Sequence, residues 1–208
     1  MRGSTVPRKS REEKAMKKNL ITAVLMTVAT TVLLGIIYPL VITGLSQVLF
    51  AKKANGQLIE ANGKIIGSRL IGQGFSGAAY FHSRPSAAGT GYDPTSTNGS
   101  QLGPTNHQLI DRVKSDVAAL QSENPGAAVP IDLVTTSASG LDPHITPAAA
   151  EFQVPRVARQ RGISEDVVRE AIRQHTEARQ LGFLGEPRVN VLELNLTLDE
   201  ISPKPQSR

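Results

Sequence analysis

The fold is decided by the stretch Leu20–Phe50, which reads LITAVLMTVATTVLLGIIYPLVITGLSQVLF. These 31 residues contain no charged side chain. A helix of about 20 apolar residues is enough to cross a hydrocarbon core of roughly 30 Å. The apolar region of a cleaved signal peptide is only about 7–15 residues long and precedes a small-residue cleavage site. No such site follows Leu45, so we predict an uncleaved transmembrane helix over residues 19–50.

The charges beside this stretch predict the direction in which it crosses the membrane. Residues 1–18 contain seven Lys and Arg and two Glu, and therefore carry the whole formal net charge of +5. Lys and Arg close to a span are retained in the cytoplasm. We therefore expect a basic cytoplasmic tail at 1–18, of which 1–15 resemble an added extension before Met16. The expected location is the cell inner membrane, with an extracytoplasmic domain at 51–200 and a flexible tail at 201–208.

Composition excludes several classes of protein. Beyond residue 18 the chain has 16 basic and 16 acidic residues, so it offers no excess of positive charge for nucleic acid. There is no cysteine, which excludes disulfide scaffolds, thiol catalysis and cysteine-ligated zinc. We predict that the chain does not bind nucleic acid.

Small side chains recur at every fourth position of the span, at Ala23, Thr27, Thr31 and Gly35. This spacing places them on one face of a helix, which we call the small-residue stripe. Small residues let helix backbones approach closely in lipid, so the stripe is a candidate packing surface for partner subunits. Small residues are also common in membrane helices without such a role. Pro39 cannot donate a backbone hydrogen bond to Gly35, so we expect it to kink or end the span.

Residues 51–200 predict a mixed domain with a small sheet, which places the whole chain in the α+β class. Its hydrophobic patterns are short and change period several times, and glycine and proline separate them. The expected elements are a hairpin at 58–66 turning at Asn62-Gly63, a helix capped by Thr105, a strand at 129–135, a helix starting at Thr146-Pro147, a helix from Ser164 to about Ala178, and a strand at 188–198.

No set of residues in this domain predicts independent catalysis or metal binding. Ser139, Asp142 and His144 lie within six positions, too close in sequence to converge as a hydrolase triad, so we interpret them as a polar turn. The four histidines do not have the spacing of metal ligands, and Gly67–Gly74 lacks the ending of a phosphate-binding loop. Three arginines are expected to clamp loops to the sheet rather than to bind an anion. They are Arg84, Arg156 and Arg188.

Seven blocks, in this order, resemble the C subunit of the Kdp potassium-transporting ATPase, the KdpC family, over roughly residues 16–199. They are Leu70–Phe75 (LIGQGF), Tyr80–Ser86 (YFHSRPS), Leu102–Asn106 (LGPTN), Asp132–Thr135 (DLVT), Ser139–Ile145 (SGLDPHI), Gln153–Ala158 (QVPRVA) and Pro187–Leu192 (PRVNVL). Gln101, Ala138 and Thr146 depart from the family, which usually has Asn, Gly and Ser there.

The resemblance implies a complex that takes up potassium at the expense of ATP. Its partners would be a channel-like pore subunit, a P-type ATPase subunit and a small fourth subunit, within membrane lipid. This chain has neither an Asp-Lys-Thr-Gly-Thr phosphorylation motif nor a Thr-Val-Gly-Tyr-Gly filter, so the implied role is accessory and non-catalytic. The family is described as raising the affinity of the catalytic subunit for ATP. Gln153 is the first residue to consider for a link to nucleotide.

The expected orientation bears on that description, because ATP is cytoplasmic and the domain is expected outside. We therefore expect any effect on ATP to be indirect, with no cofactor bound by this chain. A single-pass sensor would need cytoplasmic signalling mass, but only about 19 residues are expected inside. An anchored extracytoplasmic ligand-binding or enzymatic module remains the alternative.

Overall fold

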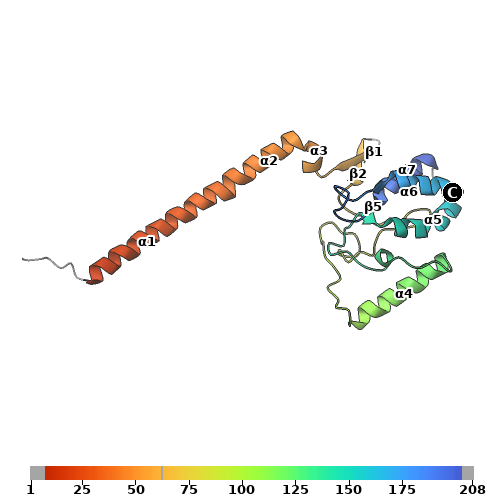
Figure 1. Cartoon of the computed structure of the whole chain (residues 1–208), viewed down its shortest axis with the longest axis horizontal. Helices are drawn as coiled ribbons and strands as arrows, with labels where there is room; N and C mark the ends of the chain where they lie inside the picture. The colour runs from red at the N-terminus through yellow and green to blue at the C-terminus, as the bar shows by residue number, and fades with distance from the viewer. Residues whose placement is uncertain (1–7, 62, 203–208) are drawn as a thin grey trace, which may run out of the picture. The chain divides into compact units, whose positions relative to one another are not determined.

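The computed structural model describes residues 8–61 and 63–202, and the chain divides into two units, Met1–Asn55 and Gly56–Arg208 (Figure 1). The first unit is a single long helix followed by a short turn of helix. The second unit, called the C-terminal domain below, contains all the strands of the described residues. This confirms the predicted α+β class with an apolar N-terminal helix. Residues 1–7 of the predicted tail, Asn62 and residues 203–208 lie outside the description.

The long helix is continuous through α1 (Arg8–Thr30), a π-helical segment η1 (Thr31–Ile37) and α2 (Tyr38–Leu49). It is the one helix among the described residues that is long and apolar enough to cross a membrane, over Glu12–Leu49, and its most apolar window has a mean hydropathy of 2.4. None of the residues in that window is buried inside the protein. The helix also runs further toward the N-terminus than residue 19.

Pro39 was expected either to kink or to end this helix, and it does not end it. The backbone N–H of Tyr38 donates to the carbonyl of Leu33, five residues back, where an α-helix would use the residue four back. The wider turn just before Pro39 accommodates a ring that would otherwise clash with the preceding turn. The helix then continues as α2 to Leu49.

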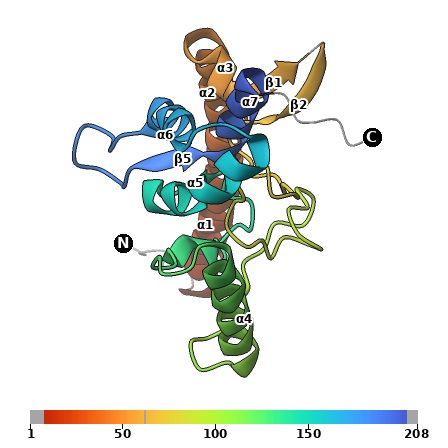
Figure 2. The same ribbon diagram turned by 90° about the vertical axis from the view of Figure 1, so that its right-hand side faces the viewer.

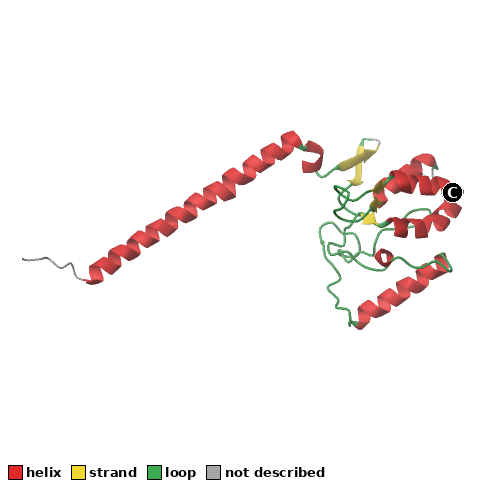
Figure 3. Ribbon diagram, viewed as in Figure 1, coloured by secondary structure: helices red, strands yellow, loops and turns green. Residues whose placement is uncertain are grey.

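The C-terminal domain begins with the predicted hairpin, after the short helix α3 (Ala51–Ala54). Strand β1 (Leu58–Ala61) pairs antiparallel with β2 (Lys64–Ser68), with a bulge between Ile59 and Glu60. A long segment of turns and loops follows, green in Figure 3, until α4 (His107–Glu123). Asn106 caps α4 by accepting a hydrogen bond from the N–H of Gln108, so the cap lies one residue after the predicted Thr105.

The centre of the domain is a three-stranded antiparallel sheet in the order β3-β5-β4, packed with helices. The strands are short: β3 is His144–Ile145, β4 is Thr176–Glu177 and β5 is Arg188–Asn190. Helices α5 (Pro147–Arg161), α6 (Glu165–Gln174) and α7 (Val191–Ile201) surround it. Figures 1 and 2 place α5 between α4 on one side and α6 with α7 on the other.

The two predicted helix starts in this region are correct. Thr146 caps α5 and Ser164 caps α6, each through a side-chain oxygen that accepts a hydrogen bond from a backbone N–H of the first turn. Helix α6 ends at Gln174, short of the predicted Ala178, because the chain turns there into β4. Gly162 ends α5 in the left-handed conformation that glycine adopts without strain.

The predicted strand at 188–198 is wrong beyond Asn190. The side chain of Asn190 accepts a hydrogen bond from the N–H of Glu193 and starts α7 there. The buried residues Val191, Leu194 and Leu198 are spaced by three and four, which is the period of a helix. Leu192 and Leu196, together with Leu194 and Leu198, also place a leucine at every second position. This alternation, which is typical of a strand, led to the strand prediction.

The predicted strand at 129–135 is also wrong, because the structure has only a single 3-10 turn, η2, at Ile131–Leu133. The turn points the side chain of Asp132 inward, where its two carboxylate oxygens accept hydrogen bonds from the N–H and the hydroxyl of Thr146, at 2.7 and 3.1 Å. Ile131 is 74% exposed although Leu133, which would lie on the same face of a strand, is buried. The segment therefore holds the start of α5 instead of extending a sheet.

Candidate functional site

Gln153, the candidate nucleotide-linked residue, lies on the buried face of α5 and is only 2% exposed. Its Oε1 accepts a hydrogen bond from the backbone N–H of His82 at 2.8 Å, and its Nε2 donates to the carbonyl of His82 at 3.1 Å. Nε2 also donates to the carbonyl of Ala149 at 3.2 Å. The amide of Gln153 therefore pairs with the loop backbone as a neighbouring strand would.

Arg156, one turn further along α5, holds the same loop. Its terminal nitrogen Nη1 donates to the carbonyls of Ala78 and Tyr80, at 2.7 and 2.9 Å. The second terminal nitrogen, Nη2, donates to Oε1 of Gln153 at 2.6 Å. Nε lies 2.9 Å from a carboxylate oxygen of Glu123, at the end of α4. Burial lowers the pKa of Arg156, and Glu123 opposes this shift. The arginine thus clamps a loop, as predicted, but onto a helix and not onto the sheet.

His82 is partly buried in this cluster. Burial is the largest cause that lowers its pKa, and the positive charge of Arg156 adds to the effect. Its Nε2 lies 3.0 Å from the carbonyl oxygen of Gly77, a contact that raises the pKa without reversing the shift. At neutral pH this histidine is uncharged.

A cavity of about 430 Å³ lies beside the cluster, between α4 and the loop that Gln153 holds. Its wall is mixed, with aromatic residues such as Phe75 and Tyr92 beside polar ones. Three arginines line it, and each has a carboxylate partner within 3.5 Å: Arg84 with Asp142, Arg112 with Asp116, and Arg156 with Glu123. An anionic ligand would have to compete with those carboxylates.

Two further residues that hold the same loop were not singled out from the sequence. The side chain of Asn195, on α7, accepts from the N–H of Phe81 at 2.8 Å and donates to its carbonyl at 3.0 Å. Arg161, whose side chain is fully buried, donates to the carbonyl of Ala79 and pairs with Asp199 at 2.8 Å. The available signal was an asparagine among the leucines of 191–198. In a helix it would lie on the buried face, where a polar side chain needs a hydrogen-bond partner.

The predicted polar turn is present at Ser139, Asp142 and His144. Oδ1 of Asp142 accepts from the backbone N–H of His144 at 3.0 Å, and Oγ of Ser139 accepts from the N–H of Leu141 at 3.1 Å. Gly140 has a φ of +68°, and a Cβ there would lie 2.5 Å from a backbone oxygen, so only glycine fits. Both polar side chains are therefore used in building the turn.

Arg84 and Arg188, the other two arginines singled out from the sequence, also have structural contacts. Arg84 donates from Nε to the carbonyl of Thr135 at 3.2 Å, so it clamps one loop to another and not to the sheet. Arg188 pairs at 2.8 Å with Glu177 on the neighbouring strand, so it joins two strands and holds no loop. Among the described residues, no group of three or more histidines and carboxylates lies close enough to hold a metal ion.

The structure aligns the small-residue stripe along one side of the long helix. The hydroxyl of Thr27 donates to the carbonyl of Ala23 at 2.9 Å, which satisfies it within the helix. A Cβ added at Gly35 would meet only Cγ2 of Thr31, at 3.8 Å, so these two residues are neighbours despite the π-helical turn. The stripe as a packing surface stays a prediction.

Comparison with known proteins places these features in a family. The family described as "K+-transporting ATPase, c chain" matches residues 20–200. The potassium-transporting ATPase KdpC subunit of Koribacter versatilis is 68% identical over 193 residues, which cover 93% of this chain and 100% of the relative. The corresponding subunit of Acidobacterium capsulatum is 59% identical over 184 residues, covering 88% of this chain and 98% of the relative. The chain belongs to the KdpC family.

Four of the seven blocks that carry the KdpC resemblance are joined to one another within the domain. Tyr80–Ser86 is the loop that Gln153 and Arg156 hold, and both of these residues belong to the block Gln153–Ala158. The block Ser139–Ile145 supplies the polar turn and strand β3, which pairs with β5 from the block Pro187–Leu192. The family pattern therefore describes chiefly how this domain is held together.

Proposed function

We propose that the chain is an accessory, non-catalytic subunit of an ATP-driven potassium uptake complex. The match to the Koribacter versatilis KdpC subunit, at 68% identity along the whole of that relative, is the observation that carries the proposal. The chain has no phosphorylation motif of a P-type ATPase and no selectivity-filter sequence, and one helix cannot enclose a pore. The pore and the ATPase site would therefore belong to partner subunits, whose assembly this chain would stabilise. A small fourth subunit is a further expected partner.

We further propose that the chain is a single-pass inner-membrane protein with a cytoplasmic N-terminus. The basic residues Lys17 and Lys18, just before the apolar run, support this orientation. The C-terminal domain would then face outward, away from cytoplasmic ATP. Any effect on the ATP affinity of the catalytic subunit would act through the complex, and the pairing of Gln153 with the loop supports a structural role for this residue.

The small-residue stripe is the proposed contact between the span and its partner helices. Ala23, Thr27, Thr31 and Gly35 leave little bulk on that side, so a neighbouring helix could approach closely there. The rest of the helix surface carries larger apolar side chains suited to membrane lipid.

Purification of the tagged protein from its own membranes in mild detergent tests the proposal. The potassium-transporting ATPase subunits should copurify, and deletion of the gene should impair growth when potassium is scarce. A reporter that is active only outside the cytoplasm, fused after Arg208, should be active. An inactive but stable fusion would contradict the orientation and reopen direct ATP binding.

The alternative is an anchored extracytoplasmic ligand-binding module. The cavity of about 430 Å³ favours it, because a small molecule could bind there. Copurification of the chain alone, together with saturable binding of a small molecule, would favour that module over the subunit.

A further inference from the structure

The middle of the long helix contains a backbone carbonyl with no donor in its own helix. The N–H of Tyr38 donates to the carbonyl of Leu33. The next donor along the chain would be residue 39, but a proline has no N–H. The carbonyl of Leu34 therefore has no amide to pair with, either four or five residues ahead.

This carbonyl lies where water cannot replace the missing bond. Leu34 and Gly35 are at the midpoint of the charge-free run Leu20–Phe50, and hence at the centre of the predicted span. An unpaired backbone group there costs several kcal/mol, and lipid acyl chains have no hydrogen-bond donors. Polar groups of neighbouring helices commonly pair with the carbonyls that a proline leaves free in a transmembrane helix.

The neighbouring residues leave room for such a side chain. Gly35 has no side chain, so a neighbouring helix can come close to this turn. Apart from its two chain neighbours and the nearby helix backbone, only Cγ2 of Thr31 lies within 4 Å of the position that its Cβ would take. Thr27 and Thr30 donate their hydroxyls to carbonyls of the preceding turn. Thr30 also donates to the carbonyl of Thr27, which is the acceptor that the hydroxyl of Thr31 would otherwise use. Within the described residues, the hydroxyl of Thr31 makes no such bond.

We propose that a transmembrane helix of a partner subunit crosses over Gly35 and donates a side-chain hydrogen bond to the carbonyl of Leu34. The donor is a hydroxyl, amide or indole N–H on that helix, and a hydroxyl or amide can also accept from Thr31. This inference rests on the proposed function, since it requires a membrane partner. It goes beyond close packing, because it assigns the partner a polar residue at the centre of the bilayer.

Two glycines of the same helix provide a matched pair for the test. Gly35→Ala adds a methyl group that meets only Thr31 in its own chain, at 3.8 Å, and Gly44→Ala adds one with nothing within 4 Å. Neither should disturb the helix itself, because alanine favours helix more than glycine does. Pro39→Ala restores a backbone N–H and lets the helix pair its own carbonyl.

The full-length chain, in detergent, is titrated against the purified complex that lacks it, and the bound fraction gives an apparent dissociation constant. Interhelical hydrogen bonds in membranes contribute modestly, so Gly35→Ala and Pro39→Ala should each weaken association by about three- to twenty-fold. Gly44→Ala should leave it unchanged. In a semisynthetic full-length chain with isotope-labelled Leu34 carbonyl, the infrared carbonyl band should move to lower frequency on assembly.

The outcomes separate this inference from the proposed function. If the wild-type chain does not associate with the potassium-transporting complex, the proposed function fails. If it associates, and Gly35→Ala binds as tightly as Gly44→Ala, the partner helix does not cross at Gly35. An unshifted Leu34 carbonyl band overturns the hydrogen bond even if the alanine variants bind weakly. Assembly of the isolated chain with itself, with the same band shift, would assign the contact to a second copy and also overturn the proposal.

Discussion

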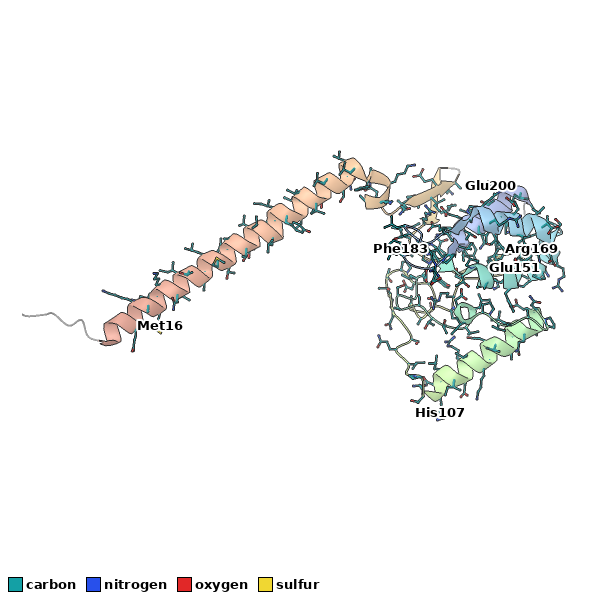
Figure 4. All side chains as sticks on the ribbon, in the orientation of Figure 1. Met16, His107, Glu151, Arg169, Phe183 and Glu200 are labelled. Carbon is teal, nitrogen blue, oxygen red and sulfur yellow. The ribbon has the colours of Figure 1, made fainter. Side chains whose placement is uncertain are left out.

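The long helix and the C-terminal domain hold their apolar residues in opposite ways. Every leucine, isoleucine and valine of the predicted span is exposed in the isolated chain, whereas Phe81, Val154 and Leu194 in the domain are fully buried. Figure 4 shows the same contrast, with side chains standing free along the helix and crowded inside the domain. The domain has its own core, whereas the apolar window of the helix contains no buried residue. Substitutions in the two regions should therefore fail in different experiments.

A matched pair of leucine substitutions tests this difference most directly. Leu194→Ala removes a fully buried side chain and should lower the free energy of unfolding of the domain by about 2–5 kcal/mol. Leu33→Ala, on the exposed helix, should leave that unfolding transition unchanged in detergent. Denaturant titration of the full-length chain measures both. Equal effects would mean that the two regions share one core.

Gln153→Ala should also act on the domain. It leaves the backbone N–H and carbonyl of His82 without partners, at an expected cost of about 1–3 kcal/mol in domain stability. Calorimetry at cellular ATP concentrations should show no saturable binding by either the wild type or the variant. Binding by the wild type that disappears in the variant would restore direct nucleotide contact and remove the purely structural role.

The stripe should respond in the assembled complex and not in domain unfolding. Replacing Thr27 and Thr31 by leucine adds bulk at two points one turn apart, and overpacking of a tight contact typically costs about 1–3 kcal/mol. Insertion into the membrane should be unaffected, since leucine is favoured there. The same change at Val28 and Val32 should be milder. Full copurification and full growth on scarce potassium for the stripe variant would leave the helix as an anchor only.

The smallest expected effect is a pH dependence of domain stability. The pKa of His82 in the folded domain is lowered, first by burial and then by Arg156. Below about pH 6.5 the unfolded chain therefore takes up a proton that the folded domain resists, and stability falls as the pH decreases. Between about pH 7.5 and 5.5, His82→Gln should lose less stability than the wild type. His107→Gln, on the exposed face of α4, is the control and should follow the wild type.

The sequence predicted those parts of the fold that are determined locally. The long helix follows from an uninterrupted apolar run, the hairpin from Asn62-Gly63, and the starts of α5 and α6 from Thr146 and Ser164. Strand 188–198 was mistaken because leucines and valines there satisfy both a two-residue and a helical period. Asn190, which caps α7 through the N–H of Glu193, was the local signal that favoured the helix.

The interior of the domain could not be predicted, because its polar partners are far apart in the sequence. Gln153 and His82 are 71 residues apart, and Asn195 and Phe81 are 114 apart. The family blocks indicated that these segments matter, but not that buried side chains hold the loop. The π-helical turn before Pro39 was missed for a different reason, since a proline in a span has several outcomes that its sequence does not distinguish.

The loop at Phe81 and His82 has a consequence for the rate at which its amides exchange hydrogen with solvent. Loop amides usually exchange quickly, because local opening exposes them at little cost. Here the N–H of Phe81 donates to Asn195 and the N–H of His82 to Gln153, each at 2.8 Å and each to a buried helix side chain. Neither can open without separating the loop from α5 or α7. These two amides should therefore exchange as slowly as the central turns of those helices, and a protection map would show a core segment where the secondary structure shows none.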